Sequence, residues 1–433
     1  MKTTISSLQW FLFIVSNSII VPIVIASQYG LNSSDSIEFV QRTLFVLAIS
    51  GLLQVLIGHR YPIMEGPAGV WWGVFSLYAS LGLVLFGSQG ETLRVLQFAL
   101  LASGVIGILL SVFGLVNKLA RYFTPPVIGT YLILLVAQLS GSFLKGMLGI
   151  ESGENTIKPL VALGSIVIVL LSFWFTSHRI FNRLNIVLSI GIGWGLFALM
   201  GLTKPINVQD ELFYIPHLFV FGAPRIEWSM VLTSLFVTFI LITNMLASIK
   251  VVESVFAQKG ERIERNTIKR SGIISGVSQL LGGSFSAVGA VPISGSGGFI
   301  STTGIVQRRP FIVASILLLF VSLFTPLTSF ISSLPAAVGY AAIFPVFASM
   351  ISLGMNEFKQ AKNEDHALKR AGIPLLAGIG VMFLPPEAFS SLSPILTTLL
   401  SNGLVFGTMI ALSLEIIHSL RKDKPYSNHK MLK

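Results

Sequence analysis

Apolar runs of about 20 residues, each with few charged side chains, recur along the whole chain. A helix of about 20 apolar residues can cross the hydrocarbon core of a bilayer, so each run predicts a membrane helix. No linker or low-complexity stretch separates the runs, and one polytopic domain is expected. The pattern predicts an all-α membrane protein with fourteen transmembrane segments, whose cores lie at residues 8–28, 42–58, 67–87, 94–116, 126–144, 159–176, 184–202, 229–249, 271–289, 291–306, 310–330, 334–354, 371–386 and 397–417.

The placement of Lys and Arg in the loops checks this count, because positively charged side chains concentrate in cytoplasmic loops. With the N-terminus inside, 23 of the 29 Lys and Arg fall on the cytoplasmic side, and the opposite loops hold only Arg42, Arg94, Lys145, Lys158, Lys204 and Arg225. A miscounted span in the middle of the chain would remove this asymmetry. The sequence therefore predicts a multi-pass protein of the cell (plasma or inner) membrane, with both termini cytoplasmic and residues 421–433 as a cytoplasmic tail.

Composition agrees with lipid as the main solvent. Of the 433 residues, 53% are hydrophobic and only 11% are charged, against about 25% charged in an ordinary soluble domain. This excludes a soluble enzyme. The net charge of +11 follows mostly from the loop asymmetry. Because the basic residues are not gathered with aromatic ones on a polar face, no nucleic-acid partner is expected.

Two of the predicted segments are interrupted by helix breakers, at corresponding positions. Fourteen is twice seven, and an odd number of spans in each half gives two inverted repeats, as in many secondary transporters. The breakers lie in the third segment of each half, at Tyr61–Gly69 and Gly289–Gly298. Interrupted backbone at membrane depth persists where it lines a cavity or is buried in protein. The pattern therefore predicts a transporter whose binding site lies between segments 3 and 10.

Each break is expected to leave a helix N-terminus, one near Gly69 and the other near Gly297. Unpaired N–H groups and the positive end of the helix dipole suit a ligand rich in carbonyl oxygens, or an anion. Glycine lets such a ligand approach the backbone closely. The alternative is that the small residues only allow tight helix packing, but the matching positions of the two breaks favour a binding site.

The sequence offers no cofactor or metal site. The chain has no cysteine, and its six histidines lie in loops or near span ends without metal-ligand spacing. It has no Walker-type motif and no soluble segment long enough for a nucleotide-binding domain, so an ion gradient or the substrate's own gradient must supply the energy. An intramembrane enzyme would need a nucleophile and base, or a metal cluster, at bilayer depth. The pattern contains neither.

Glu65 is the one acid expected well inside the bilayer, directly before the Gly66-Pro67 break. A carboxyl group at that depth is costly to keep charged, and a group that takes up and releases a proton is the functional interpretation. The alternative is a carboxylate that pairs with His59 or Arg60, or that caps the freed backbone.

Other polar and aromatic positions have two interpretations each. Asn244 and Ser248 lie one turn apart in the eighth segment and face the same direction, either as ligand contacts or as interhelical hydrogen-bonding residues. Lys250 and Glu253 predict a surface ion pair at the end of that segment. The Trp71-Trp72 pair suits stacking on a planar ring and, equally, packing against the opposite domain.

Several motifs resemble the nucleobase/cation symporters, also called the nucleobase/ascorbate transporter family, which includes bacterial uracil and xanthine permeases. Residues 123–130 are similar to the Pro-Pro-Val-x-x-Gly opening of the family's fifth span, and residues 401–408 to the Ser-x-Gly-x-x-x-Gly-Thr of its last span. In the family signature, Gly298, Thr303 and Gly304 match. The resemblance covers nearly the full chain and favours a purine as the substrate.

The departures from the family are also specific. The binding acid of the signature is Gly295 here, its Asn is Ser296, the His of the first span is Trp10, and the acid of the eighth span falls on or near Ala247. The resemblance therefore implies recognition by the backbone N–H groups of paired short strands that break segments 3 and 10. The expected substrate-binding residues, with Glu65 also in the proton-coupling role, are Glu65, Ala68, Gly69, Asn244, Ser248, Ser294, Gly295, Ser296, Gly297 and Gly298.

The resemblance also implies an architecture and a function. Residues 1–122 and 229–309 would form a core domain, and residues 123–228 and 310–420 a gate domain. The function expected is import of a purine or pyrimidine nucleobase, by proton symport with movement of core against gate. The alternative is an anion transporter of the related sulfate-permease architecture. The resemblance does not specify which base is transported or whether the coupled ion is a proton or sodium. It also does not specify whether the chain forms a homodimer through the gate.

Overall fold

The computed structural model describes residues 2–119, 124–150, 156–178, 185–203, 211–262, 267–361, 363–389 and 402–422, with the single positions 122, 181, 264, 392, 396 and 400. The predicted tail from residue 423 and residues 397–399 of the fourteenth predicted segment lie outside this set. The described chain is mostly helical, as predicted, and it contains one two-stranded sheet.

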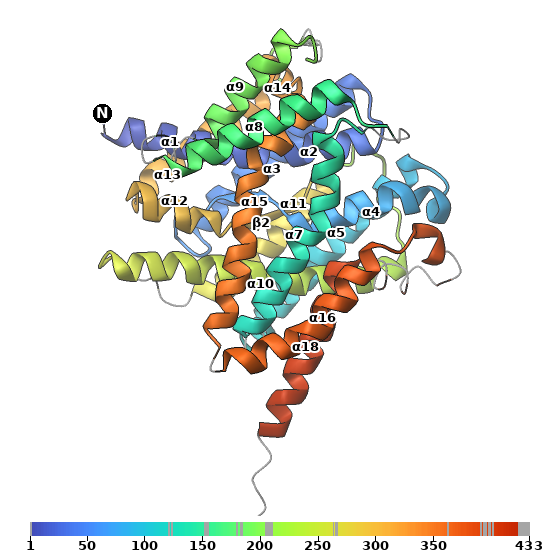
Figure 1. Ribbon diagram of the computed structural model, residues 1–433, viewed down its shortest axis with the longest axis vertical. Coiled ribbons are helices and arrows are strands. Elements are labelled where there is room, and N and C mark those ends of the chain that lie inside the picture. The colour runs from blue at the N-terminus through green and yellow to red at the C-terminus, as the bar shows by residue number, and fades with distance from the viewer. Residues whose placement is uncertain are drawn as a thin grey trace, which may run out of the picture.

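The helices of the first half run as follows (Figure 1): α1 Lys2–Ser18, α2 Ile20–Gln28, α3 Ser33–Leu56, α4 Gly69–Phe86, α5 Gln89–Val112, α6 Leu115–Leu119, α7 Pro125–Met147, α8 Pro159–Ser177 and α9 Asn185–Leu199. Those of the second half are α10 Trp228–Gln258, α11 Thr267–Ser284, α12 Gly295–Thr303, α13 Arg308–Leu323, α14 Thr325–Ser332, α15 Ala336–Lys359, α16 Glu364–Met382 and α18 Gly403–Lys422, with a 3-10 helix at Pro386–Phe389. The strands are β1 Glu65–Pro67 and β2 Ala290–Pro292.

Local signals explain where several helices begin and end. Asn32 caps α3 by accepting a hydrogen bond from the Asp35 N–H at 2.8 Å, and Ser88 caps α5 by accepting one from the Glu91 N–H at 3.1 Å. Both α7 and α8 carry proline in their first turn, where no intrahelical N–H bond is lost. Helix α4 ends at Gly87, whose φ of +89° favours glycine.

Six stretches of described helix have the length and composition of a membrane span: Thr4–Gln28, Ser33–Leu56, Gln89–Val112, Pro125–Met147, Pro159–Ser177 and Trp228–Ala257. They coincide with predicted segments 1, 2, 4, 5, 6 and 8. The helices of the other predicted segments are not among these six stretches, so the count of fourteen and the inverted repeat stay predictions.

Two interruptions were not predicted. The first segment divides at Ile19 into α1 and α2, and Pro22 lies just beyond, where it cannot donate to the carbonyl of Ser18. The eleventh segment divides at Phe324, directly before a proline-containing first turn of α14. Proline therefore accounts for both divisions within otherwise continuous apolar runs.

The helices pack in two groups (Figure 1). In one group, α5 lies against α11 and α10, α3 against α11 and α13, and α1 against α13. In the other, α7 lies against α15, α16 and α18, and α8 lies against α15 and α9. Contacts between the groups are fewer, and they include those of α4 with α7 and of α2 with α15.

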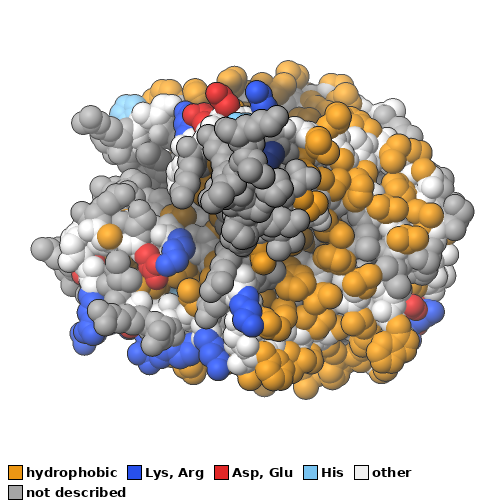
Figure 2. All heavy atoms as spheres, turned by 90° about the horizontal axis from the view of Figure 1, so that it is seen from below, with side chains coloured by type: hydrophobic (Ala, Val, Ile, Leu, Met, Phe, Trp, Pro, Cys, Tyr) orange, Lys and Arg blue, Asp and Glu red, His pale blue; other side chains and the backbone are white. Residues whose placement is uncertain are grey.

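Large apolar side chains also cover the outside of the molecule. On α8 the exposed fractions of Leu163, Leu170 and Phe173 are 59%, 64% and 65%. Figure 2 shows hydrophobic side chains spread over a broad area of one face, with several Lys and Arg at its edge. An exposed apolar surface of this extent suits contact with lipid rather than water.

One predicted ion pair lies near the end of α10, and one that was not predicted lies in the loop that follows it. Lys250 and Glu253 form the predicted pair at 2.7 Å. Glu264, in the loop after α10, accepts a hydrogen bond from Arg308 at the start of α13. That guanidinium holds the pKa of the Glu264 carboxyl below its usual range.

Because the Glu264 pKa is lower in the folded than in the unfolded protein, its contribution to stability is complete above the unfolded pKa and is lost as the pH falls through the folded pKa. We expect Glu264→Gln to lower stability at pH 7 by up to about 1 kcal/mol, as for a partly exposed pair. The difference from wild type should begin to shrink as the pH falls below the ordinary glutamate pKa of about 4.3, and it should vanish only below the lowered pKa of the folded protein. Thermal unfolding in detergent over a pH series from about 7 to about 3 measures this, and a difference that stays constant over the series would contradict it.

Candidate functional site

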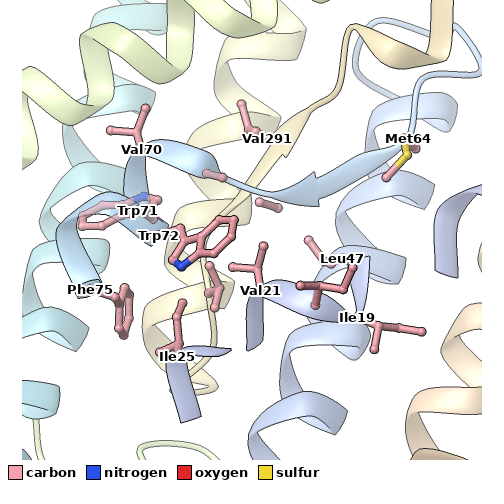
Figure 3. Close-up of a cluster of buried hydrophobic side chains, with 14 of the residues drawn as sticks. Ile19, Val21, Ile25, Leu47, Met64, Val70, Trp71, Trp72, Phe75 and Val291 are labelled. Atoms are coloured by element: carbon pink, nitrogen blue, oxygen red, sulfur yellow. The ribbon is translucent and has the colours of Figure 1, made fainter. Parts of the chain in front are cut away.

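The two predicted breaks meet as paired strands. β1 and β2 are antiparallel, with Glu65 opposite Pro292. One further backbone hydrogen bond extends the pair at each end, from the Ala68 N–H to the Gly289 carbonyl at 2.8 Å and from the Ile293 N–H to the Met64 carbonyl at 3.0 Å. The predicted strands in segments 3 and 10 are thus present. Figure 3 shows Val291 on one side of them and Val21 and Trp72 on the other.

A helix begins directly after each strand. Helix α4 starts at Gly69, as predicted, and α12 starts at Gly295, two residues before the predicted Gly297. The N-cap residues Ala68 and Ser294 form no side-chain capping bond. In α12 the N–H groups of residues 296 and 297 already bond to the carbonyls of residues 293 and 294. The tight first turn therefore uses two of the donors that the sequence assigned to a ligand.

The glycines of α12 divide into two kinds. Gly295 and Gly298 are exposed, and a Cβ at Gly298 would meet no atom within 4 Å. A Cβ at Gly295 would meet only ordinary contacts, with Phe13 at 3.9 Å among them. Gly297 is buried, and its Cβ would lie 2.4 Å from Val251 of α10. Gly297 therefore serves helix packing, whereas Gly295 and Gly298 place no side chain on an accessible side of the helix.

Two of the three predicted serines, Ser296 and Ser248, form hydrogen bonds to backbone at the strands. The Ser296 hydroxyl accepts a hydrogen bond from the Met64 N–H at 3.0 Å, which ties α12 to the residue before β1. The Ser248 hydroxyl donates to the Pro292 carbonyl at 2.8 Å, which ties α10 to β2. Asn244 is half-buried one turn before Ser248. The Ser248 hydroxyl thus contacts β2 itself, and the Ser296 hydroxyl contacts the residue directly before β1.

Glu65 lies in β1 with only 2% of its surface exposed. Neither carboxylate oxygen has a hydrogen-bond partner among the described residues. The alternatives of a pair with His59 or Arg60, or of a backbone cap, are therefore wrong for this structure. A buried carboxyl group without protein partners can accept a proton or a hydrogen bond from a ligand.

The signature residues at the end of α12 have local structural roles. The Thr303 hydroxyl donates to the Phe299 carbonyl at 2.7 Å, and Gly304 ends the helix with a φ of +73°. A left-handed C-cap favours glycine. These two matches to the family signature thus define where the short helix stops.

Sequence reasoning missed a buried glutamine beside β2. The Gln279 amide of α11 donates to the Ala290 carbonyl at 2.6 Å, and its oxygen accepts from the Trp71 indole at 2.8 Å. A glutamine within an apolar segment was the available signal. Trp72 instead packs against Phe143 of α7 and Tyr340 of α15, with ring centroids 5.3 and 6.1 Å away. Of the two interpretations of the tryptophan pair, packing against the opposite helix group is confirmed for Trp72.

Trp10, at the position of the family's histidine, is fully buried in an aromatic cluster. Its ring centroid lies 4.3 Å from that of Phe299 of α12 and 5.1 Å from that of Phe311 of α13. Its indole N–H has no partner among the described residues. The aromatic cluster therefore borders the accessible glycines of α12.

Comparison with known sequences places the chain in a family. The family model Xan_ur_permease, described as "Permease family", matches residues 1–387. The chain belongs to this permease family. Among its relatives, the Bacillus subtilis protein named "Putative purine permease YwdJ" is 42% identical over 98% of both chains. The Bacillus subtilis "Xanthine permease" is 25% identical over 97% of this chain and 94% of its own.

A third relative, "Uric acid permease PucJ" of Bacillus subtilis, is 26% identical over 96% of this chain and 93% of its own. These relatives are permeases and not enzymes, and with the apolar helices they identify a multi-pass membrane protein. The resemblance to nucleobase permeases is thereby confirmed, and membership of the family supports transport of a nucleobase.

Solved structures share the fold of this permease. The transmembrane domain of the cyanobacterial bicarbonate transporter BicA aligns with a TM-score of 0.64 at 15% identity, over 96% of this chain and 97% of that one. The murine anion transporter Slc26a9 in its inward-facing state aligns with a TM-score of 0.63 at 15% identity, over 97% of this chain and 68% of that one. At this identity the likeness shows the fold alone.

Proposed function

We propose that this permease imports a purine or pyrimidine nucleobase across the cell membrane by proton symport. The observation that carries the proposal is the buried Glu65 carboxyl, which has no hydrogen-bond partner in the part of the chain that the structure describes, in a strand that leads directly into a helix N-terminus. Nucleobases carry both ring N–H donors and carbonyl oxygens. The carboxyl can accept a hydrogen bond from a ring N–H, and backbone N–H groups near the strands can donate to a carbonyl.

Proton coupling follows from the cost of an unpaired charge. A carboxylate in a desolvated site is expensive, so Glu65 binds substrate most favourably together with a proton. Release of both to the cytoplasm would then complete one import cycle. Sodium coupling is the competing expectation, and sodium would need several oxygen ligands beside Glu65.

The movement proposed is that of a core domain, residues 1–122 and 229–309, against a gate domain, residues 123–228 and 310–420. The two helix groups support most of this division, because α7, α8, α9, α15, α16 and α18 pack mainly with one another. Helix α13 lies in the gate range by sequence but packs against α1 and α3 of the core group. The contact of Trp72 with Phe143 and Tyr340 lies between the groups and would slide during transport. We place both termini in the cytoplasm, as the distribution of Lys and Arg favours.

The second candidate is transport of an anion. The likeness of the fold to bicarbonate and anion transporters favours it. A buried acid in the paired strands opposes it, because a carboxylate repels an anionic ligand. Family membership favours the nucleobase.

Uptake into proteoliposomes separates these candidates. Radiolabelled xanthine, guanine, hypoxanthine, uracil and bicarbonate are offered with and without an inward proton gradient. We expect accumulation of one base, which a protonophore abolishes. Accumulation that follows a sodium gradient would overturn the proton coupling. Uptake of bicarbonate but of no base, by folded protein, would overturn the nucleobase substrate.

A further inference from the structure

Three non-glycine residues adopt left-handed backbone conformations within the described part of the chain: Arg60 with a φ of 62°, Phe219 with 52° and Ser286 with 51°. Such conformations are strained for residues other than glycine and persist where surrounding contacts enforce them. Arg60 lies in the turn that leads into β1, and Ser286 lies in the turn that leads into β2. Phe219 belongs to the loop that covers the second turn. All three therefore surround the paired strands.

The turn before β2 is held from the loop between α9 and α10. The Phe219 N–H donates to the Ser284 carbonyl at 2.8 Å. The Ser286 hydroxyl donates to the side-chain oxygen of Gln97, a residue of α5 with 2% exposure. The amide nitrogen of Gln97 in turn donates to the Gly222 carbonyl at 3.0 Å. Gln97 thus joins the turn before β2 to the loop.

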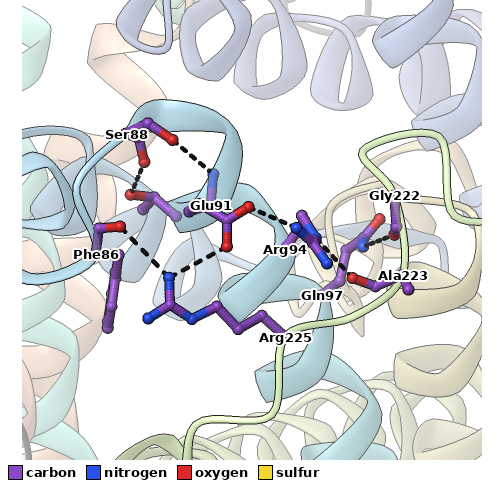
Figure 4. A network of polar contacts seen from close by, with 9 residues as sticks. Phe86, Ser88, Glu91, Arg94, Gln97, Gly222, Ala223 and Arg225 are labelled. Carbon is purple, nitrogen blue, oxygen red and sulfur yellow. Dashed lines mark hydrogen bonds and ion pairs between the residues drawn. The ribbon is translucent and has the colours of Figure 1, made fainter.

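The same loop is fixed to α5 by charged side chains (Figure 4). Arg94 donates to the Ala223 carbonyl at 2.8 Å, and Arg225 donates to Glu91 at 3.1 Å. These contacts do not involve the strand turn. Gln97 is therefore the member of this network that reaches the turn before β2.

The turn before β1 is held in a corresponding way from the loop that follows α10. The Glu264 N–H donates to the Tyr61 hydroxyl at 2.8 Å. The Tyr61 ring packs against Phe256 of α10 with centroids 5.2 Å apart, and the Tyr61 N–H donates to the His59 Nδ1 at 3.1 Å. Tyr61 is 1% exposed. The loops at the two ends of α10 therefore each hold one turn.

We propose that Gln97 and Tyr61 are positioning residues, which hold the left-handed turns and thereby keep β2 and β1 where the nucleobase binds. The inference rests on the proposed nucleobase transport. A pair of three-residue strands is marginal by itself and needs support from outside the sheet. The Gln97 and Tyr61 contacts provide it, because each joins a turn to a loop next to α10, and Ser248 of α10 also bonds to β2.

The test uses three variants of the full chain. Ser286→Gly removes the hydroxyl but keeps a residue that adopts positive φ freely, Gln97→Leu removes both amide bonds, and Tyr61→Phe removes only the hydroxyl. Arg225→Gln is the matched control, because Arg225 belongs to the Figure 4 network and does not touch the turn. Gel filtration and thermal unfolding in detergent establish that each variant is folded.

Two measurements decide the proposal. For whichever of xanthine, guanine, hypoxanthine and uracil the wild type takes up fastest, each of the three variants is expected to raise KM about tenfold with Vmax within twofold, and Arg225→Gln to leave both unchanged. Without any substrate, hydrogen exchange of residues 287–293 is expected to become at least about fivefold faster in Ser286→Gly and Gln97→Leu. Exchange unchanged in both variants would overturn the positioning role.

The two proposals fail in different ways. Wild-type protein that takes up none of the four bases overturns the proposed function, and the exchange measurement still decides whether Gln97 and Ser286 hold β2. Wild-type uptake combined with unchanged KM in all three folded variants overturns the positioning role and leaves nucleobase transport standing. An equal rise of KM in Arg225→Gln would also overturn it, because the effect would then belong to the whole loop.

Discussion

Glu65→Gln is expected to abolish uphill accumulation of the nucleobase. The exchange of labelled for unlabelled base across the membrane is expected to stay intact. Glutamine has nearly the same shape as glutamate, but it cannot take up and release a proton. A proton gradient of one pH unit corresponds to about 1.4 kcal/mol, so one-to-one symport supports about tenfold accumulation. The variant should therefore fall from about tenfold accumulation to about onefold, measured as internal against external label in proteoliposomes.

Glu415→Gln is the matched control for this prediction. Glu415 of α18 lies in the other helix group and pairs with Arg370 at 3.2 Å. Its loss is expected to leave accumulation unchanged, because the carboxyl already has a partner and lies far from the strands in sequence. A Glu65→Gln protein that accumulates base as well as wild type would remove Glu65 from the coupling mechanism.

Gly289→Ala is expected to destabilise the protein and to reduce transport at least tenfold. An added Cβ would lie 2.3 Å from the Gln279 side-chain oxygen and 2.6 Å from the Trp71 ring, both buried and hydrogen-bonded to each other. Neither group can move without breaking that bond or the bond from Gln279 to the Ala290 carbonyl. Overpacking and a lost buried hydrogen bond together should cost about 2–4 kcal/mol.

Thermal unfolding in detergent and initial uptake rates measure this effect. Gly73→Ala is the control, because a Cβ on that glycine of α4 would meet no atom within 4 Å. Alanine is the better helix former by about 1 kcal/mol, so the control should be as stable as wild type or more so. Wild-type stability in Gly289→Ala would mean that β2 can shift away from α11 without cost. That result would contradict the prediction.

Much of the site could be located from sequence because its signals are local. Glycine and proline interrupt an apolar run wherever they occur, so the breaks at segments 3 and 10 and the start of α4 at Gly69 were predictable. Glu65 was evident as well, because a single acid within an apolar run is also a local signal. The start of α12 was missed by two residues, because the serines and glycines around it fit a helix and a turn equally well.

The roles of individual side chains were less predictable. Ser248 and Ser296 were expected to contact substrate, which stays a prediction, whereas their hydrogen bonds to the backbone of Pro292 and of Met64 were not expected. The pairing of Trp71 with Gln279, and of Trp72 with the opposite helix group, joins residues far apart in the chain. A single sequence contains no distance between such residues, so their partners could not be read from it.

The sequence by itself determined the solvent, the class and the place of the breaks, because the cost of charge and of unpaired backbone in lipid acts on each segment separately. Only the tertiary structure decided which polar groups are already satisfied. It gave Glu65 no hydrogen-bond partner among the residues described and joined Ser286 to Gln97, because hydrogen bonding in a buried site depends on which segments fold against one another.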